Sequence, residues 1–210
     1  FQEAYGNYPL AVAFGYYGPM HDGPLWPLYL EPRNLPLSPN YLTSFPPSGD
    51  RIGECILYNH TLEEILILCN EMSETWDKGV KILKELKAFY VSDRERIKEI
   101  NTAAALGVHF RSGINIFRFY DLREKLAKNN QIDALGILER MKQIVLDEIK
   151  NSEELLDYVN YDPLIGFSSD AEDYKYYPEK FYWRIGQLEN LLKKEFPRIK
   201  ERIEEGLVPF

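Results

Sequence analysis

The sequence is poor in the residues that build small chemical centres. It has two cysteines, three histidines and three methionines in 210 residues. Two cysteines are too few for a disulfide framework, and no Cys/His spacing matches a zinc site. The sequence also lacks a glycine-rich phosphate loop and the G-x-S-x-G pattern around a hydrolase serine. We therefore predict no metal and no cofactor.

Long apolar runs and an excess of basic charge are absent as well. No stretch approaches the roughly 20 apolar residues that a membrane-spanning helix needs, and the formal net charge is −8. This charge disfavours general binding to nucleic acid or to an anionic membrane. The first residues lack an initiator Met and the basic start of a signal peptide, so we expect a piece of a longer protein. The compartment stays open, with the cytoplasm slightly favoured.

Prolines and aromatic residues are concentrated at the beginning of the chain. Nine of the thirteen prolines precede Gly49, together with seven tyrosine and tryptophan residues. Prolines at this density prevent long helices and confine strands to sheet edges. We predict that residues 1–58 form an extended arm, with one short strand at Leu10–Tyr17, and that the arm packs on the rest of the chain.

Residues 59–210 have the periodicity of helices. Apolar residues recur at steps of three and four in four stretches, which predict helices over 61–90, 92–127, 131–158 and 179–196, the last continuing past Pro197 as a short charged tail. The expected caps are Thr61, Ser92 and Asn130. Short connections favour antiparallel neighbours. The predicted fold is all-α: an antiparallel bundle of four to five helices in residues 59–210, preceded by the arm.

Two core details follow from the helical stripes. Cys69 falls on the stripe of the first helix, so we expect a buried, reduced thiol there. Leu135 falls on the stripe of the third helix and is expected in the core.

The first group of candidate site residues lies between Tyr16 and Trp26. Aromatic rings stack on the apolar faces of sugars, and His and Asp side chains bond hydroxyl groups. The candidates for ligand contact are therefore Tyr17, His21, Asp22 and Trp26. The alternative is a loop whose aromatic residues only anchor it to the helices, with a turn at Asp22-Gly23.

The second group is Asp50, Arg51 and Glu54. Two carboxylates near an arginine are typical of glycoside hydrolysis, which uses a pair of acids. In a sequence this rich in acids such a pair arises readily by chance, with Arg51 bridging the two carboxylates, and this interpretation is favoured.

The third group lies on the predicted central helix. Arg111, Asn115 and Arg118 follow one another at steps of four and three and share one face. Polar side chains on so apolar a helix need partners, and the acids between Asp170 and Asp173 are candidate partners. The face is interpreted as a structural polar network in preference to a ligand site, and His109 as a histidine at the core boundary. The acids of 170–173 have no EF-hand spacing, so a solvated loop is preferred to a calcium site.

The segment from Asn151 to Leu192 resembles the closing segment of a large group of bacterial proteins that are classed with glycoside hydrolases or as domains of unknown function. The resemblance rests on Asn151, Asp162, Gly166-Phe167, Glu172, Tyr174, Trp183, Ile185, Gln187 and Leu188. The stretches YYGPMHDGPLWPLYLEP and SGDRIGEC are similar to the same group. This resemblance implies a helical C-terminal module that follows a catalytic barrel domain. It assigns no catalytic residue in this chain.

Three functions are therefore considered. The favoured one is a non-catalytic helical C-terminal domain of a carbohydrate-active, glycoside hydrolase-like enzyme, inactive alone, whose arm contributes to the sugar-binding cleft. Its expected partners are the upstream barrel domain of the same protein and a carbohydrate; the oligomeric state stays open. The alternative is a protein-interaction scaffold that binds a partner through the arm. The least favoured is an autonomous glycoside hydrolase using Asp50 and Glu54.

Overall fold

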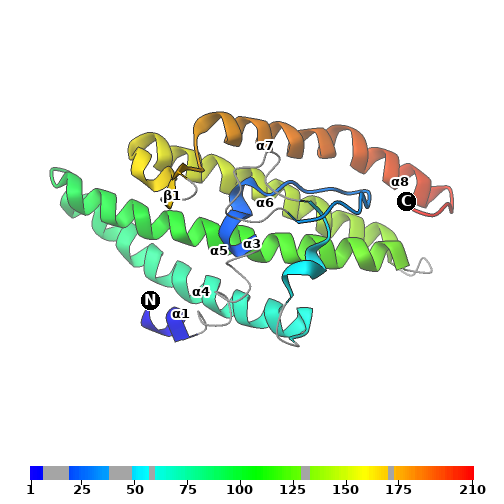
Figure 1. Cartoon of the computed structure of the whole chain (residues 1–210), viewed down its shortest axis with the longest axis horizontal. Coiled ribbons are helices and arrows are strands. Elements are labelled where there is room, and N and C mark those ends of the chain that lie inside the picture. Colours follow the sequence, from blue (N-terminus) through cyan, green and yellow to red (C-terminus); the bar gives the residue numbers. More distant parts are fainter. Residues whose placement is uncertain (7–18, 38–48, 57–59, 129–132, 170–172) are drawn as a thin grey trace.

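Four long helical segments form the body of the protein. The computed structural model describes residues 1–6, 19–37, 49–56, 60–128, 133–169 and 173–210. The long segments are α4 (Leu62–Leu86), α5 (Arg94–Lys128), α6 (Ala134–Tyr161) and the succession of α7 (Pro178–Asn190), a π-helical turn (Leu191–Glu195) and α8 (Phe196–Glu204). Figure 1 shows α5 at the centre, α4 along one side, and α6 between α5 and the α7–α8 segment. The prediction of an all-α bundle is confirmed.

Short elements connect and cover these helices. They are α1 (Gln2–Gly6), α3 (Pro19–Asp22), four 3-10 turns at Gly23–Leu25, Ile52–Cys55, Lys87–Tyr90 and Pro163–Gly166, and the strands β1 (Phe167–Ser169) and β2 (Asp173–Tyr174). The two strands pair antiparallel, with Phe167 opposite Tyr174. α1 packs on α4, and α3 packs on α5.

The helix starts agree with the sequence at α4 and differ at α5. Thr61 caps α4: its hydroxyl accepts the N–H of Glu64 at 3.2 Å, and the Glu64 carboxylate accepts the N–H of Thr61 at 2.8 Å. The expected cap at Ser92 is wrong, because α5 begins two residues later and the Asp93 carboxylate accepts the N–H of Arg96 instead. α6 begins at Ala134, after the expected Asn130, which lies outside the described residues.

Two prolines near the C-terminus shape the last helical segment. Pro178 is the first residue of α7, where its missing N–H leaves no helical bond unmade. Further along, the π-helical turn lies directly before Phe196 and Pro197. A proline inside a helix removes one backbone hydrogen bond and crowds the preceding turn, so a wider turn at this point accommodates it.

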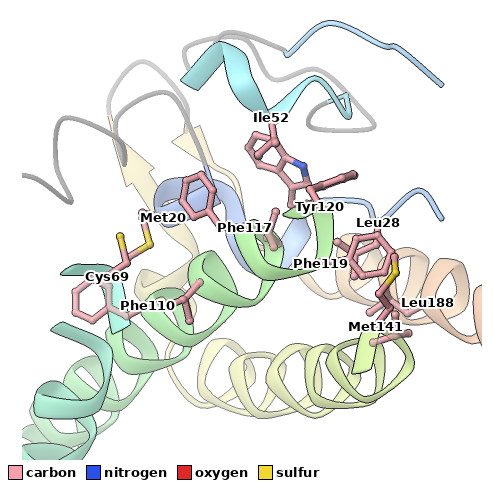
Figure 2. Packing of buried hydrophobic residues seen from close by; sticks show 14 of the residues in the cluster. Met20, Leu28, Ile52, Cys69, Phe110, Phe117, Phe119, Tyr120, Met141 and Leu188 are labelled. Carbon is pink, nitrogen blue, oxygen red and sulfur yellow. The ribbon is translucent and has the colours of Figure 1, made fainter. Parts of the chain in front are cut away.

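The core surrounds α5 on nearly all sides. On α4 the buried residues recur at steps of three and four, and on α5 buried residues occupy nearly every turn of the helix. In Figure 2, Phe119 of α5, Met141 of α6 and Leu188 of α7 converge on Leu28 of the arm. A segment without helix or strand therefore supplies part of the bundle's core.

The arm between Pro24 and Leu35 is fixed by side chains that bond its backbone. The helices provide this set of contacts: Ser152 Oγ to Pro24 O at 3.4 Å, Arg184 Nε to Trp26 O at 2.9 Å, the Tyr120 hydroxyl to Pro27 O at 3.0 Å, Gln187 to both backbone groups of Leu28, and Arg123 Nη1 to Tyr29 O at 3.2 Å. Buried backbone polar groups must be paired, and here the pairing comes from α5, α6 and α7. The expected strand at Leu10–Tyr17 lies outside the described residues.

The predictions that Cys69 and Leu135 are buried have different outcomes. Cys69 is fully buried and carries a free thiol, as predicted, and burial raises its pKa to about 12. Leu135 is 44% exposed, so its expected place in the core is wrong. Ala134 and Ile137 take the buried positions of that turn instead. Within the described part of the chain, no helix has the length and apolar character needed to cross a membrane.

Candidate functional site

A cavity lies between α4, α5 and α6. Its volume is about 860 Å³, and we call it the Arg111 pocket. Its lining is Asn70, Ser73, Glu74, Asp77, Val80, Lys81, Lys84, Glu85, Arg111, Ile114, Asn115, Arg118, Asp147, Lys150, Asn151 and Glu154. All three residues of the predicted polar face of α5 are among these.

Arg111 connects the three helices around the pocket. Its guanidinium donates to Asp77 Oδ1 on α4 at 2.7 Å and to Glu154 Oε2 on α6 at 2.6 Å. Its Nε donates to Asn151 Oδ1 at 3.3 Å. A guanidinium carries several donors in a fixed plane, so one side chain can orient two carboxylates at once. Arg111 therefore sets the geometry of the pocket.

Asp77 lies against the backbone of α5. A methyl group added at Gly107 would lie 3.0 Å from Asp77 Oδ1, so the absence of a side chain at Gly107 leaves space for the carboxylate. Burial raises the pKa of Asp77 above its usual value, and the positive charge of Arg111 offsets only part of this effect. A carboxyl group with a raised pKa in a cavity is a recognised mark of a functional site.

Glu154 has the opposite electrostatic environment. Burial alone would raise its pKa, but Lys84 at 2.8 Å and the charge of Arg111 outweigh it, and the pKa lies below the usual value. The Tyr158 hydroxyl also donates to Glu154 Oε1, at 2.9 Å. The two carboxylates on either side of Arg111 thus differ in their affinity for a proton, a difference that proteins use to separate the roles of paired acids.

A second layer of polar residues lies beneath the pocket. Glu148 and Arg184 are both fully buried and form an ion pair at 2.9 Å. Glu148 also accepts from Ser112, from Asn115 at 2.8 Å and from Asn151 at 2.7 Å. Since Asn151 contacts Arg111 as well, a continuous set of hydrogen bonds runs from the pocket to Arg184 and on to the backbone of the arm.

The predicted partners of the α5 face need a correction. The sequence suggested acids between Asp170 and Asp173, whereas the structure pairs Arg111 and Asn115 with residues of α4 and α6, and Arg118 with Asn70 of α4 at 2.5 Å. Residues 170–172 lie outside the described residues. His109 is half-buried, and its ring meets the ring of Tyr176 edge to face at 4.9 Å between centroids.

The first predicted ligand group is largely buried where it is described. Tyr17 and the side chain of His21 lie outside the described part of the chain. Asp22 is 2% exposed and forms an ion pair with Lys175, which is also buried. Trp26 is 1% exposed and belongs to the core. The described positions of Asp22 and Trp26 therefore favour the interpretation of this segment as an anchored loop, while a role in ligand contact stays a prediction.

The second predicted group is divided between interior and surface. Asp50 is 2% exposed and binds Arg123 at 2.7 Å, and its carboxylate also accepts the backbone N–H groups of Arg33 and Leu35. Arg51 does not bridge Asp50 and Glu54; within the described residues it forms an exposed pair with Glu54, at 2.5 Å. Asp50 thus fastens the arm to α5, and a ligand-binding role for this group stays a prediction.

Sequence reasoning missed Asp77, Lys84 and Glu154. The signal that was available lies on α6, where the buried residues Met141, Val145, Leu155 and Val159 continue a regular stripe through Glu148 and Ser152. Charged and hydroxyl side chains at such core positions require buried partners. Their place in the stripe indicates a polar patch on the face of α6 that meets Arg111.

The lining of the Arg111 pocket has a mixed chemistry. No group of three or more His, Cys, Asp or Glu side chains suited to a metal ion occurs among the residues described above. The lining instead mixes carboxylates, amides, ammonium groups and guanidinium groups. Comparisons with family models, with curated proteins and with solved structures each found no match.

Proposed function

We propose that this chain is a non-catalytic helical domain of a carbohydrate-active, glycoside hydrolase-like protein, and that the Arg111 pocket binds a neutral sugar. The observation that carries the proposal is the lining of the pocket, in which five basic and five acidic side chains surround a volume of about 860 Å³. A volume in this range accommodates a small ligand. The upstream barrel domain suggested by the sequence resemblance is part of the same proposal.

The balance of charge in the pocket favours a neutral ligand. Phosphate and nucleic-acid sites carry an excess of basic groups, whereas the acids and bases of this lining are equal in number. A sugar hydroxyl both donates and accepts hydrogen bonds. Carboxylates such as Glu74 accept, ammonium groups such as Lys81 donate, and the amide of Asn70 does both.

The arrangement of the two acids bound to Arg111 supports binding rather than hydrolysis. Glycosidases place two carboxyl groups on either side of the scissile bond. Here Asp77 and Glu154 are both bound to the guanidinium of Arg111. Arg111 thus occupies the space between the acids that a substrate would need. We expect no turnover of chromogenic glycosides by this chain at any pH at which it is folded.

The experiment is a calorimetric titration of the chain with neutral mono- and disaccharides. Lys84→Met and Asn70→Ala each remove a polar group from the lining, and Lys142→Met is the matched control on the outside of α6. We expect saturable binding of at least one sugar, at least tenfold weaker binding in the pocket variants, and no change in the control. Absence of saturable binding, or equal affinity in all variants, would contradict the proposal.

A protein-interaction domain is the second candidate. Its support is the turn between α4 and α5, where Phe89 is 81% and Val91 79% exposed. The described arm residues are less suited to this role, because most of those between Gly23 and Leu30 are buried against the bundle. Sedimentation velocity of the wild type and of Phe89→Ser tests self-association through this turn. A wild-type monomer over the accessible concentration range would remove this support.

A further inference from the structure

A second pocket, separate from the Arg111 pocket, lies at the end of the bundle where α6 gives way to the strands and α7. It has a volume of about 380 Å³, and we call it the tyrosine pocket. The residues that matter for its chemistry are Asn160, Pro163, Tyr174, Tyr176, Tyr177 and Pro178. Three phenol rings and two proline rings thus surround one amide.

The backbone beneath the tyrosines is fixed. The carbonyl of Gly166 accepts the N–H groups of both Lys175 and Tyr176, at 3.0 and 3.1 Å. A side chain at Gly166 would collide with the carbonyl oxygen of Tyr176, so only glycine permits this close approach. Lys175, between two of the tyrosines, is anchored further by its buried ion pair with Asp22.

Other side chains pack against the three tyrosine rings of the pocket. Tyr176, 4% exposed, meets His109 edge to face and also contacts Phe181. Tyr174 packs against Phe167 with 5.6 Å between ring centroids, and Lys180 lies over the ring of Tyr177 at 4.8 Å. Tyr174 and Tyr177 remain 49% and 40% exposed. Rigid aromatic groups that are already in place lose little entropy when a ligand binds.

The polar side-chain groups of this lining are uncharged: three phenols and one amide, each of which has a donor. The phenol groups and the Asn160 amide can donate, and no carboxylate lines the pocket. The side chains of Tyr174, Tyr177 and Asn160 make no hydrogen bond to another described residue. A sugar needs strong acceptors as well as donors for its hydroxyls. A polyproline segment needs only donors, because prolines have no N–H and present carbonyl oxygens alone.

The charge near the pocket also suits a peptide of this kind. Asp157 precedes Asn160 by one helical turn on α6, and Glu179 follows Pro178 on α7; both are exposed. Neither forms an ion pair with another residue in the described part of the chain. The ammonium group of Lys180 over Tyr177 adds one positive charge, so these two carboxylates leave a net negative charge that complements a basic residue beside the prolines. Aromatic grooves that bind polyproline helices recognise the preformed ridges of the ligand in this way.

We propose that the tyrosine pocket binds a proline-rich segment of a partner protein, in the polyproline II conformation and flanked by a basic residue. The proposal concerns a different surface from the sugar pocket and does not depend on it. Stacking and packing of proline rings against Tyr174 and Tyr177 supply the affinity. The phenol and amide donors select for carbonyl oxygens, and the exposed acids set the direction of the segment.

The experiment measures fluorescence anisotropy of a labelled synthetic peptide that has a Pro-x-x-Pro core and a flanking arginine, titrated with the full chain. The control peptide has the prolines replaced by alanine. Tyr174→Ala and Tyr177→Ala remove rings from the pocket. Tyr182→Ala removes a 60% exposed tyrosine that lies outside its lining. Tyr177→Phe keeps the ring and removes only the hydroxyl, which preserves the test if an alanine variant unfolds.

We expect saturable binding of the proline peptide and at least tenfold weaker binding of the alanine peptide. Both alanine variants should weaken binding at least tenfold, Tyr177→Phe should do so about threefold, and Tyr182→Ala should have no effect. No binding of the proline peptide, or equal binding by all variants, would overturn the proposal. Displacement of the peptide by a neutral disaccharide, together with sugar binding that Tyr174→Ala abolishes, would assign the pocket to sugars instead. Lys84→Met changes the Arg111 pocket and not the tyrosine pocket, so it should leave peptide binding unchanged. A failure of the sugar proposal can therefore be distinguished from a failure of the peptide proposal.

Discussion

Glu148 and Arg184 form an ion pair at 2.9 Å in which both side chains are fully buried. Glu148 comes from the middle of α6 and Arg184 from α7, and the carbonyl of Trp26 completes the coordination of the guanidinium at 2.9 Å. Burying two charges is unfavourable unless each is paired and hydrogen bonded. The pair therefore requires the helices and the arm to be in place together, which joins the arm to the bundle in a single folding unit.

The first prediction concerns the loss of one member of this pair. Arg184→Met leaves Glu148 buried without its cation and should lower the free energy of unfolding by about 3–5 kcal/mol. The double variant Glu148→Leu/Arg184→Met should cost less than the single variant, because no uncompensated charge remains. Urea unfolding followed by far-UV circular dichroism measures both. Arg198→Met, which breaks an exposed pair with Glu31, is the control and should change stability little. A double variant as unstable as the sum of the two singles would contradict the interpretation.

The second prediction concerns Asp50 and pH. Burial alone would raise the pKa of Asp50, but the N–H groups of Arg33 and Leu35 and the side chain of Arg123 outweigh it, and the pKa lies below the usual 3.8. A depressed pKa in the folded state means that the carboxylate stabilises the fold above the unfolded pKa, and that this contribution is lost as pH falls through the folded pKa.

The Asp50→Asn variant tests this relation. Its free energy of unfolding should be lower than that of the wild type at neutral pH, and the difference should shrink below about pH 4 as the wild-type carboxylate takes up a proton. Chemical unfolding at several pH values measures the difference. A difference that stays constant down to pH 2 would show that Asp50 acts by shape rather than by charge.

The third prediction separates the two acids bound to Arg111. The pKa of Asp77 is raised in the folded state, so the contribution of this group to stability is present at low pH and is lost as pH rises through the folded pKa. The pKa of Glu154 is lowered, so its contribution to stability is present above the unfolded pKa and is lost as pH falls through the folded pKa. At neutral pH, Asp77→Asn should therefore change stability little, since the amide oxygen still accepts from Arg111. Glu154→Gln should cost about 1 kcal/mol, the upper range for a partly exposed pair. Thermal unfolding of both variants at neutral pH measures this, and equal losses would contradict the assignment.

The sequence predicted the long helices well because their apolar stripes are regular. The capping box at Thr61 and the proline at the start of α7 are local signals, and both were found in the structure. Leu135 was misplaced because the buried stripe at the start of α6 runs through Ala134, Ile137 and Leu138, and Leu135 does not belong to it. Local periodicity could not correct this error.

The pocket could be predicted only in part. The spacing of Arg111, Asn115 and Arg118 marked one polar face of α5, but its partners are far away in the chain: Asp77 lies 34 residues and Glu154 43 residues from Arg111. Which acids reach a given arginine depends on how the helices cross, which sequence spacing does not encode. The resemblance directed attention to the arm, where burial of Trp26 and Asp22 became visible only in three dimensions.

The last prediction compares two glycines in helices. A methyl group at Gly113 of α5 would overlap the sulfur of Met20 and approach the Met20 Cα at 3.0 Å, so α3 would have to move, whereas a methyl group at Gly186 of α7 would meet nothing within 4 Å. Gly113→Ala should destabilise the protein by about 1–3 kcal/mol, because overpacking outweighs the gain in helix propensity. Gly186→Ala should stabilise it by about 0.5–1 kcal/mol, the ordinary preference of a helix for alanine. Urea unfolding of the two variants under identical conditions measures both. If Gly113→Ala were as stable as Gly186→Ala, the close contact between α3 and α5 would not be a constraint on the fold, and the arm would have to be held by its hydrogen bonds alone.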